Sequence, residues 1–119
     1  MTLPILTEDR EQMNLVLWLQ EKGYKFTAIP NSTFTRSWKQ KLHNKDMGLR
    51  AGFPDIVVIA HNIFIAIELK RSDGGSGATP AQKSWIANLQ AAGIPAKVCN
   101  GKDEAVAFIE ATVKAAIAQ

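Results

Sequence analysis

Two apolar runs, separated by only two polar residues, place the strongest constraint on how this chain folds. The runs cover residues 54–60 and 63–70, and His61 and Asn62 lie between them. Both runs are too rich in Ile, Val, Phe and Ala to lie against water on either face, so each predicts a buried strand. Asn and His tolerate the left-handed backbone that a two-residue turn requires. The sequence therefore predicts a buried antiparallel hairpin.

Three ionisable residues interrupt this apolar hairpin. A turn at His61 and Asn62 places Asp55 opposite Glu68, and Lys70 lies on the same face because it follows Glu68 by two residues. Opposed residues have Cβ atoms about 4.5 to 5.5 Å apart, which lets both carboxylates bind one divalent cation. Isolated, each residue has an ordinary explanation as a strand start or a surface ion pair, but buried charges are costly without a partner or a task. Together they predict a metal site.

A metal ion held in this way suits phosphodiester hydrolysis. Asp55, Glu68 and a nearby backbone carbonyl, that of Leu69, would bind Mg²⁺ or Mn²⁺, which polarises the phosphate and lowers the pKa of a bound water. Lys70 would position the attacking water and stabilise charge, since its carboxylate neighbours oppose its deprotonation.

The composition is that of one small globular domain over residues 1–119. The chain has a mass of 13.0 kDa, 46% hydrophobic residues and a net charge of +3. Its single cysteine, Cys99, excludes an internal disulfide and cysteine-rich zinc sites, so a metal would need oxygen ligands. No apolar run reaches the ~20 residues of a membrane helix, and the N-terminus lacks signal-peptide features. We expect a soluble, intracellular, cytoplasmic protein with no membrane partner.

The order of predicted elements indicates an α/β sandwich. Thr7 can cap a first helix that ends at Gly23, and Thr79, Pro80 and Gln82 form a capping-box pattern for a later helix that runs to Gly93. Strands are predicted at 24–29, 54–60, 63–70 and 94–99, and a last helix opens at Asp103 or Glu104. This αβββαβα order predicts a central mixed β-sheet flanked by helices.

A basic segment separates the first two strands. Between residues 34 and 50 one acid, Asp46, stands against five basic residues, with Phe34 and Trp38 among them; the bases are Arg36, Lys39, Lys41, Lys45 and Arg50. Such a segment, part helix and part loop, can follow a phosphate backbone. It can equally be a solvated stretch of no particular function, and the sequence leaves both interpretations open.

The charged residues of the hairpin resemble the motif of a nuclease superfamily. Pro54-Asp55 and Glu68-Leu69-Lys70 match the two halves of the PD-(D/E)XK signature. More narrowly, the chain resembles the stand-alone VRR-NUC domains of phages and bacteria along nearly its whole length. Further matches lie at Thr7-Glu8 with Gln12, Pro30-Asn31, Gly48, Gly52-Phe53-Pro54-Asp55, Lys70-Arg71, Thr79-Pro80 with Gln82 and Trp85, and Gly93.

The resemblance implies a restriction-endonuclease-like fold and a metal-dependent DNA endonuclease. It implies Asp55 and Glu68 as metal ligands, Lys70 as the catalytic lysine, Gln82 in the site or in its helix cap, and a supporting glutamate from the first helix. Glu8 is favoured for that last role because it shares a helical face with Gln12, Leu15 and Leu19, and Glu11 is the alternative.

The resemblance also implies a homodimer that acts on branched DNA such as four-way junctions, in a bacterial cell or a phage-infected host. Candidate DNA contacts are Asn31, Arg36, Lys39, Lys41, Lys45, Arg50 and Arg71. Two other functions stay open: a nuclease fold that binds DNA without cutting it, and an interaction protein whose buried charges only fix strand register.

Overall fold

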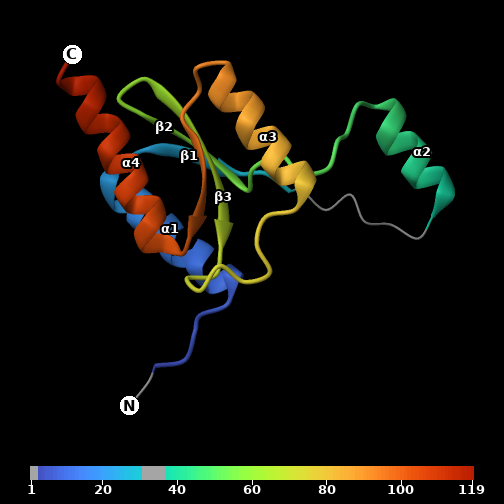
Figure 1. Cartoon of the computed structure of the whole chain (residues 1–119), viewed down its shortest axis with the longest axis horizontal. Coiled ribbons are helices and arrows are strands. Elements are labelled where there is room, and N and C mark those ends of the chain that lie inside the picture. Colours follow the sequence, from blue (N-terminus) through green and yellow to red (C-terminus); the bar gives the residue numbers. More distant parts are fainter. Residues whose placement is uncertain (1–2, 31–36) are drawn as a thin grey trace.

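A computed structural model of the chain describes residues 3–30 and 37–119. The described elements form a mixed sheet with helices on both faces (Figure 1). In chain order they are α1 (Glu8–Lys22), β1 (Lys25–Ala28), α2 (Trp38–Asp46), β2 (Ile56–Ala60), β3 (Ile63–Lys70), α3 (Pro80–Ala91), β4 (Ala96–Asn100) and α4 (Lys102–Ile117). The predicted α/β sandwich is confirmed, and α2 adds a helix within the basic segment.

The sheet contains the predicted hairpin in the predicted register. Its strand order is β1-β2-β3-β4, antiparallel except for the parallel pair β3-β4. Ala60 pairs with Ile63, and the ladder ends at Ile56 and Ile67. His61 and Asn62 both have positive φ, 49° and 64°, as the two-residue turn requires. Asp55 therefore lies one residue before the ladder, in line with Glu68.

Two apolar clusters hold the helices to the sheet. The larger joins α1 and α4 to one face through residues such as Leu15, Ile67 and Ile109, all fully buried. The smaller joins α3 to the opposite face, where Ile86 packs with Ala66 and Ala96. In Figure 1 α1 and α4 accordingly lie on one side of the strands and α3 on the other. Glu68 and Lys70 share the α3 face with Ala66, because side chains alternate along β3.

Helix caps were predictable because they are local. The Thr7 hydroxyl accepts the Arg10 N–H at 3.2 Å, and Gly23 ends α1 with a φ of 73°. Thr79 and Gln82 form a complete capping box at the start of α3.

The expectation that both central strands avoid water on either face was wrong at one end. Ile59 and Phe64, which are cross-strand partners, have exposed side chains. The apolar cluster on the α3 face contains Ala66, Ile86 and Ala96 with Val57 packed against it, and it does not extend to Ile59 and Phe64 near the turn. Among the described residues, no helix is long and apolar enough to cross a membrane.

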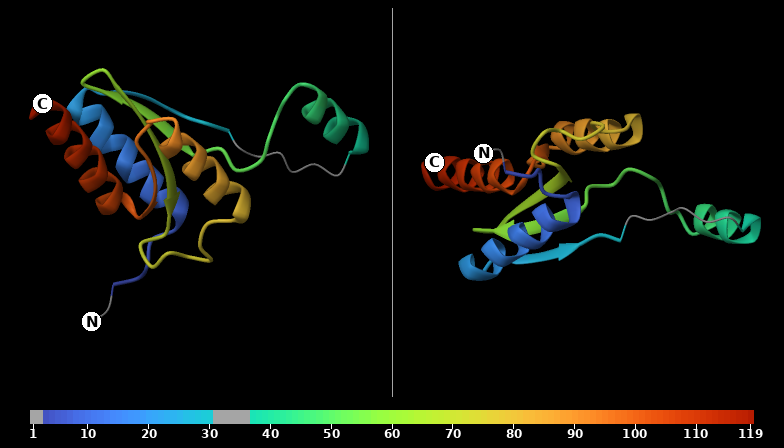
Figure 2. Two further views of the ribbon diagram at one scale, coloured as in Figure 1. Left: turned by 45° about the horizontal axis from the view of Figure 1, so that its top comes forward. Right: turned by 90° about the horizontal axis from the view of Figure 1, so that it is seen from below.

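Helix α2 is an exposed part of the described structure. None of the residues in α2 is buried. Both views in Figure 2 show this helix standing away from the sheet and the other helices. Residues 37–52, called the α2 arm below, therefore form a projection, and its C-terminal end lies shortly before the start of β2.

Candidate active site

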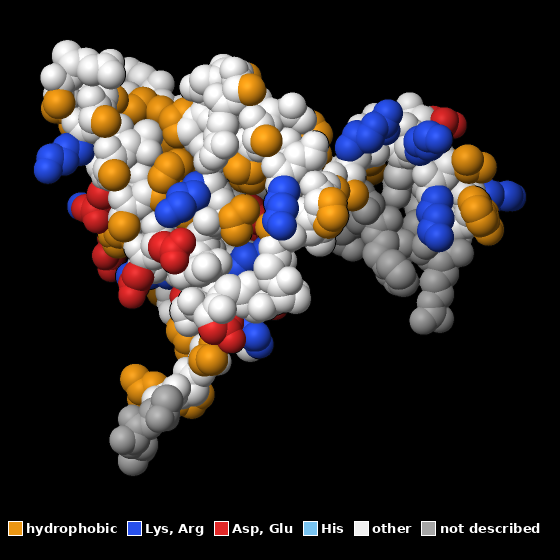
Figure 3. Space-filling view, in the orientation of Figure 1, with side chains coloured by type: hydrophobic (Ala, Val, Ile, Leu, Met, Phe, Trp, Pro, Cys, Tyr) orange, Lys and Arg blue, Asp and Glu red, His pale blue; other side chains and the backbone are white. Residues whose placement is uncertain are grey.

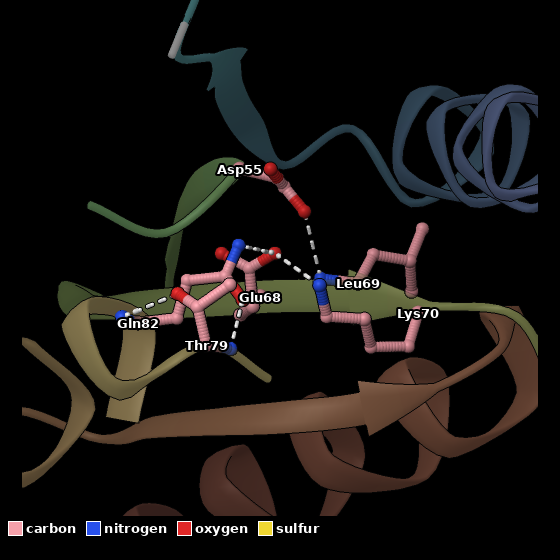
Figure 4. Close-up of polar contacts among 6 residues, drawn as sticks. All are labelled: Asp55, Glu68, Leu69, Lys70, Thr79 and Gln82. Carbon is pink, nitrogen blue, oxygen red and sulfur yellow. Dashed lines mark hydrogen bonds and ion pairs between the residues drawn. The ribbon is translucent and has the colours of Figure 1, made fainter. Parts of the chain in front are cut away.

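Asp55 is held by main-chain contacts on both sides. Its carbonyl oxygen accepts the Ile29 N–H at 2.8 Å, and its carboxylate Oδ2 accepts the Leu69 N–H at 3.0 Å. Because β2 begins only at Ile56, the Leu69 N–H has no partner in β2, and the Asp55 carboxylate takes that place (Figure 4). The sequence analysis missed this contact, although the register already indicates that Leu69 lies beyond the ladder. Asp55 is thus fixed against β3, half-buried.

Glu68 is a buried carboxylate, and one of its oxygens has no hydrogen-bond partner among the described residues. The residue is 1% exposed. Its Oε2 accepts a hydrogen bond from Gln82 Nε2 at 3.3 Å and lies 3.6 Å from Lys70 Nζ. Its Oε1 is buried and, within the described part of the chain, has no hydrogen-bond partner. A buried charged oxygen without a partner is costly, and it is the kind of atom that a cation would satisfy.

The environment of Glu68 raises its pKa from 4.5 to about 8. Burial is the largest cause because it disfavours the charged form, and the neighbouring Asp55 carboxylate adds to it. The Lys70 ammonium acts in the opposite direction and only partly offsets these effects. Without a cation, Glu68 therefore takes up a proton near neutral pH.

The side chain of Gln82 is shared between the helix cap and the Glu68 carboxylate. The side-chain Oε1 of Gln82 accepts the Thr79 N–H at 2.9 Å, and the backbone N–H of Gln82 donates to the Thr79 hydroxyl at 3.2 Å. The remaining amide group, Nε2, points at Glu68, as Figure 4 shows. The cap therefore orients the amide, since Oε1 is already committed to the helix start.

The two candidate glutamates of α1 differ in burial. Glu8 is exposed in the first helical turn, where an acid suits the helix dipole. Glu11 is 6% exposed and lies on the buried face with Leu15 and Leu19. Glu8 lies on the side of the helix that carries Gln12, Leu15 and Leu19, but it precedes the buried part of α1, which begins at Glu11.

Glu11 meets the carboxyl ends of β3 and β4. Its Oε1 accepts the Lys102 N–H at 3.0 Å. The preceding residue, Gly101, donates its N–H to the Lys70 carbonyl at 2.8 Å. Glu11 is thereby connected through two backbone contacts to Lys70, whereas no described hydrogen bond or ion pair links the Glu8 side chain to the site.

The predicted DNA contacts are distributed over two places. Lys39, Lys41 and Lys45 lie on α2, and the Arg50 guanidinium donates to the Lys45 carbonyl at 3.2 Å. Figure 3 shows this concentration of basic side chains on the projecting arm. Arg71 follows Lys70 directly and pairs with Asp73 at 3.2 Å. Asn31 and Arg36 lie outside the described residues.

The chemistry of the donor atoms fits a hard divalent cation. Among the described residues, no group of three His, Cys, Asp or Glu side chains is placed to hold a metal ion, so the protein ligands would be two carboxylates and main chain. Mg²⁺ accepts such a set because it keeps several waters and binds proteins through one or two carboxylates.

The Leu69 carbonyl has the direction that a ligand would need. In an extended strand the N–H and C=O of one residue point to the same edge. The Ala66 N–H and the Lys70 C=O point toward β4, while the Leu69 N–H points to Asp55. The Leu69 carbonyl therefore points to the edge where Asp55 lies, beyond the end of β2.

Comparisons with known proteins agree with this architecture. A family model described as the VRR-NUC domain matches residues 5–103. A solved structure titled "VRR_NUC domain protein" is 34% identical, with a TM-score of 0.68, and the match covers 94% of this chain and 92% of that one. A second, titled "VRR_NUC domain", has a TM-score of 0.63 at 19% identity, covers 87% of this chain and 94% of its own, and supports the fold alone. No curated protein matches the chain.

The family match covers most of the sequence, and the described fold is shared with solved members. The residues that carry the PD-(D/E)XK resemblance converge at one end of the β2-β3 hairpin. The chain belongs to the VRR-NUC domain family, whose nuclease domains process DNA.

Proposed function

We propose that this chain is a metal-dependent, structure-selective DNA endonuclease that hydrolyses phosphodiester bonds in branched DNA such as four-way junctions. One observation carries the proposal: Glu68 Oε1 is buried without a described partner beside Asp55, at a site that also holds Lys70. Two carboxylates and an ammonium in this arrangement suit a metal-assisted attack on phosphate.

Each residue has a separate task in this proposal. Asp55, Glu68 and the Leu69 carbonyl hold Mg²⁺ or Mn²⁺, which would polarise the phosphate and lower the pKa of the attacking water. Lys70, which is buried against Glu68, positions that water and stabilises charge on the phosphate. Gln82 keeps Glu68 in place through Nε2. Glu11, in place of Glu8, supplies the supporting acid from α1.

Branch selectivity is proposed together with a homodimer. A chain of 13.0 kDa has little surface with which to recognise a junction. A two-fold dimer presents two active sites to two symmetric strands, which matches the symmetry of a four-way junction.

Cleavage of synthetic DNA tests the proposal. Purified protein is incubated with junction, flap, nicked and linear duplex DNA in Mg²⁺, Mn²⁺ or chelator. We expect cutting of branched substrates with either metal, none with chelator, and none by Asp55→Asn or Lys70→Ala. Cleavage that persists in both variants would remove Asp55 and Lys70 from the mechanism. Binding of every substrate without cutting by the wild-type protein would instead support the inactive DNA-binding alternative.

A further inference from the structure

Residues 51–53, called the root of the α2 arm, pack on α3 next to the proposed active site. Trp85 Nε1 donates to the Ala51 carbonyl at 3.1 Å, and the Phe53 and Trp85 rings meet edge to face with centroids 5.1 Å apart. Gly52 packs so closely on α3 that an added Cβ would lie 2.6 Å from the Ala81 backbone. Asp55 follows after two more residues, so the arm and the site share one rigid support.

The exposed face of α2 combines apolar and basic side chains. Trp38 and Leu42 lie one turn apart and are 76% and 55% exposed. Lys41 and Lys45 flank them on the same side of the helix, at i+3 and i+7 from the tryptophan. The Lys41 ammonium lies 5.5 Å from the Trp38 ring centroid. This surface is an apolar ridge bordered by cations.

The charge of the arm selects the partner. From residue 37 to residue 52 the arm contains Lys39, Lys41, Lys45 and Arg50 against Asp46 alone. Such an excess favours a polyanion over the apolar face of another protein. An exposed tryptophan beside those lysines adds a surface on which a base can stack.

We propose that α2 is a branch-reading wedge, in which Trp38 stacks on an unstacked base at a DNA branch point while Lys41 and Lys45 bind the adjacent phosphates. Apolar side chains inserted between bases are the known means by which proteins hold unstacked DNA. A branch point supplies an unstacked base without the cost of opening a duplex, so Trp38 favours junctions over linear DNA. The wedge rests on the proposed function in one respect, that branched DNA is the substrate.

Because the arm is anchored close to Asp55, the wedge affects where the DNA is cut. A branch held by Trp38 lies within the reach of the arm from the carboxylates, because the arm is anchored where Ala51, Gly52 and Phe53 contact α3. The wedge therefore limits the distance between the branch point and the cleaved bond.

Equilibrium binding in chelator separates the wedge from catalysis. Fluorescence anisotropy gives Kd for a four-way junction and for a linear duplex of the same sequence, for the wild-type protein and for Trp38→Ala, Trp38→Phe and Lys41→Ala/Lys45→Ala. Leu17→Ala is the matched control, since Leu17 is a 59% exposed residue on α1. We expect Trp38→Ala to lower the preference for the junction by at least about 5-fold, the minimum for one lost base stack. Trp38→Phe should restore most of it.

The other variants report on the phosphates and on folding. The double lysine variant should weaken junction and duplex binding alike and flatten the salt dependence, because it removes phosphate contacts. Leu17→Ala should leave both affinities unchanged. With a junction that carries 2-aminopurine at the branch, we expect the wild-type protein to change the fluorescence of this base on binding. Among these variants, only Trp38→Ala should abolish that change.

Two results would overturn the wedge. One is an unchanged ratio of junction to duplex affinity in Trp38→Ala. The other is conversion of a dimer to a monomer by Trp38→Ala in light scattering, with both affinities reduced together, which would make the ridge a protein interface. A wild-type protein that prefers junctions through Trp38 but never cuts them would refute the proposed nuclease function and leave the wedge in place.

Discussion

Gln82 Nε2 lies 3.3 Å from Glu68 Oε2 while the other end of the same amide closes the capping box with Thr79. The start of α3 is thereby connected to the buried carboxylate on β3 by one side chain. The cap decides which atom of Gln82 faces Glu68, since an amide has one acceptor oxygen and one donor nitrogen. Gln82 therefore contributes both to the stability of α3 and to the position of Glu68, and substitutions can separate these two contributions.

Replacing Gln82 by Glu should preserve the helix and damage the site. A glutamate completes the capping box equally well but places a carboxylate against Glu68 where the wild-type protein has a donor. We expect Gln82→Glu to reduce cleavage by at least about 10-fold, since one favourable hydrogen bond becomes a repulsion. Thr79→Ala is the complementary variant: it should cost about 1 kcal/mol of stability from the lost cap and retain most cleavage. Equal cleavage by Gln82→Glu and the wild-type protein would exclude the positioning role.

The raised pKa of Glu68 predicts how metal-free stability depends on pH. The folded state keeps this carboxyl protonated up to about pH 8, whereas the unfolded chain releases the proton near pH 4.5. Its contribution to stability is thus complete below about pH 4.5 and is lost as pH rises through 8. In chelator, the unfolding free energy of the wild-type protein should fall relative to Glu68→Gln between pH 5 and 8, by on the order of 2 kcal/mol. Urea titrations of both proteins across this range measure the difference, and parallel curves would contradict the assignment.

Metal binding should release the same proton. A carboxyl group must ionise before it binds a cation, so affinity for Mg²⁺ should increase with pH up to about 8. Calorimetry of Mg²⁺ binding in two buffers with different ionisation enthalpies counts the protons released. Near pH 7 we expect close to one proton for the wild-type protein and none for Glu68→Gln. Identical counts in the two proteins would show that Glu68 is not the titrating group.

Glu11 and Glu8 form a matched pair for the supporting role from α1. Glu11→Gln keeps an oxygen for the Lys102 N–H but removes the charge, so it should retain its fold and lose about 10-fold in cleavage. Glu11→Ala should in addition lose about 1 kcal/mol of stability, because the Lys102 N–H loses its acceptor. Glu8→Gln should match the wild-type protein in cleavage, since Glu8 is exposed. The reverse ranking of the two glutamine variants would return the role to Glu8.

Gly52 and Gly48 separate close packing from backbone strain at the root of the arm. Both have positive φ, 96° and 91°, so alanine is strained at either position. At Gly52 the added Cβ would clash, at 2.6 Å from the Ala81 backbone, whereas at Gly48 no atom of the described residues lies within 4 Å of it. Gly52→Ala should therefore destabilise the fold by about 1 to 3 kcal/mol more than Gly48→Ala, as measured by thermal or urea unfolding. Equal losses would mean that the arm root does not pack on α3 as described.

Much of the fold could be predicted because its signals are local. The hairpin register follows from His61 and Asn62, whose left-handed backbone fixes which residues face each other. The start of α3 follows from Thr79, Pro80 and Gln82 within one helical turn. The bounds of β3 were predicted without error because its apolar run begins at the turn and stops at a charged residue.

Other features could not be predicted because they depend on distant segments. Exposure of Ile59 and Phe64 depends on how far α3 extends over the sheet, which no strand pattern records. The placement of the α2 arm likewise depends on contacts that Ala51, Gly52 and Phe53 make with α3, about thirty positions along the chain.

The sequence by itself determined the pair of carboxylates and their register, because a two-residue turn and the alternation of side chains leave one arrangement. Only the tertiary structure decided which glutamate of α1 is buried, because Glu11 acquires its partner from Lys102, ninety-one residues away. It also decided that Gln82 contacts both the helix cap and Glu68, and that Glu68 Oε1 has no hydrogen-bond partner among the residues that the structure describes. Local periodicity fixes which face a side chain occupies, but the contacts that stabilise or perturb its charge come from elements that the chain brings together only on folding.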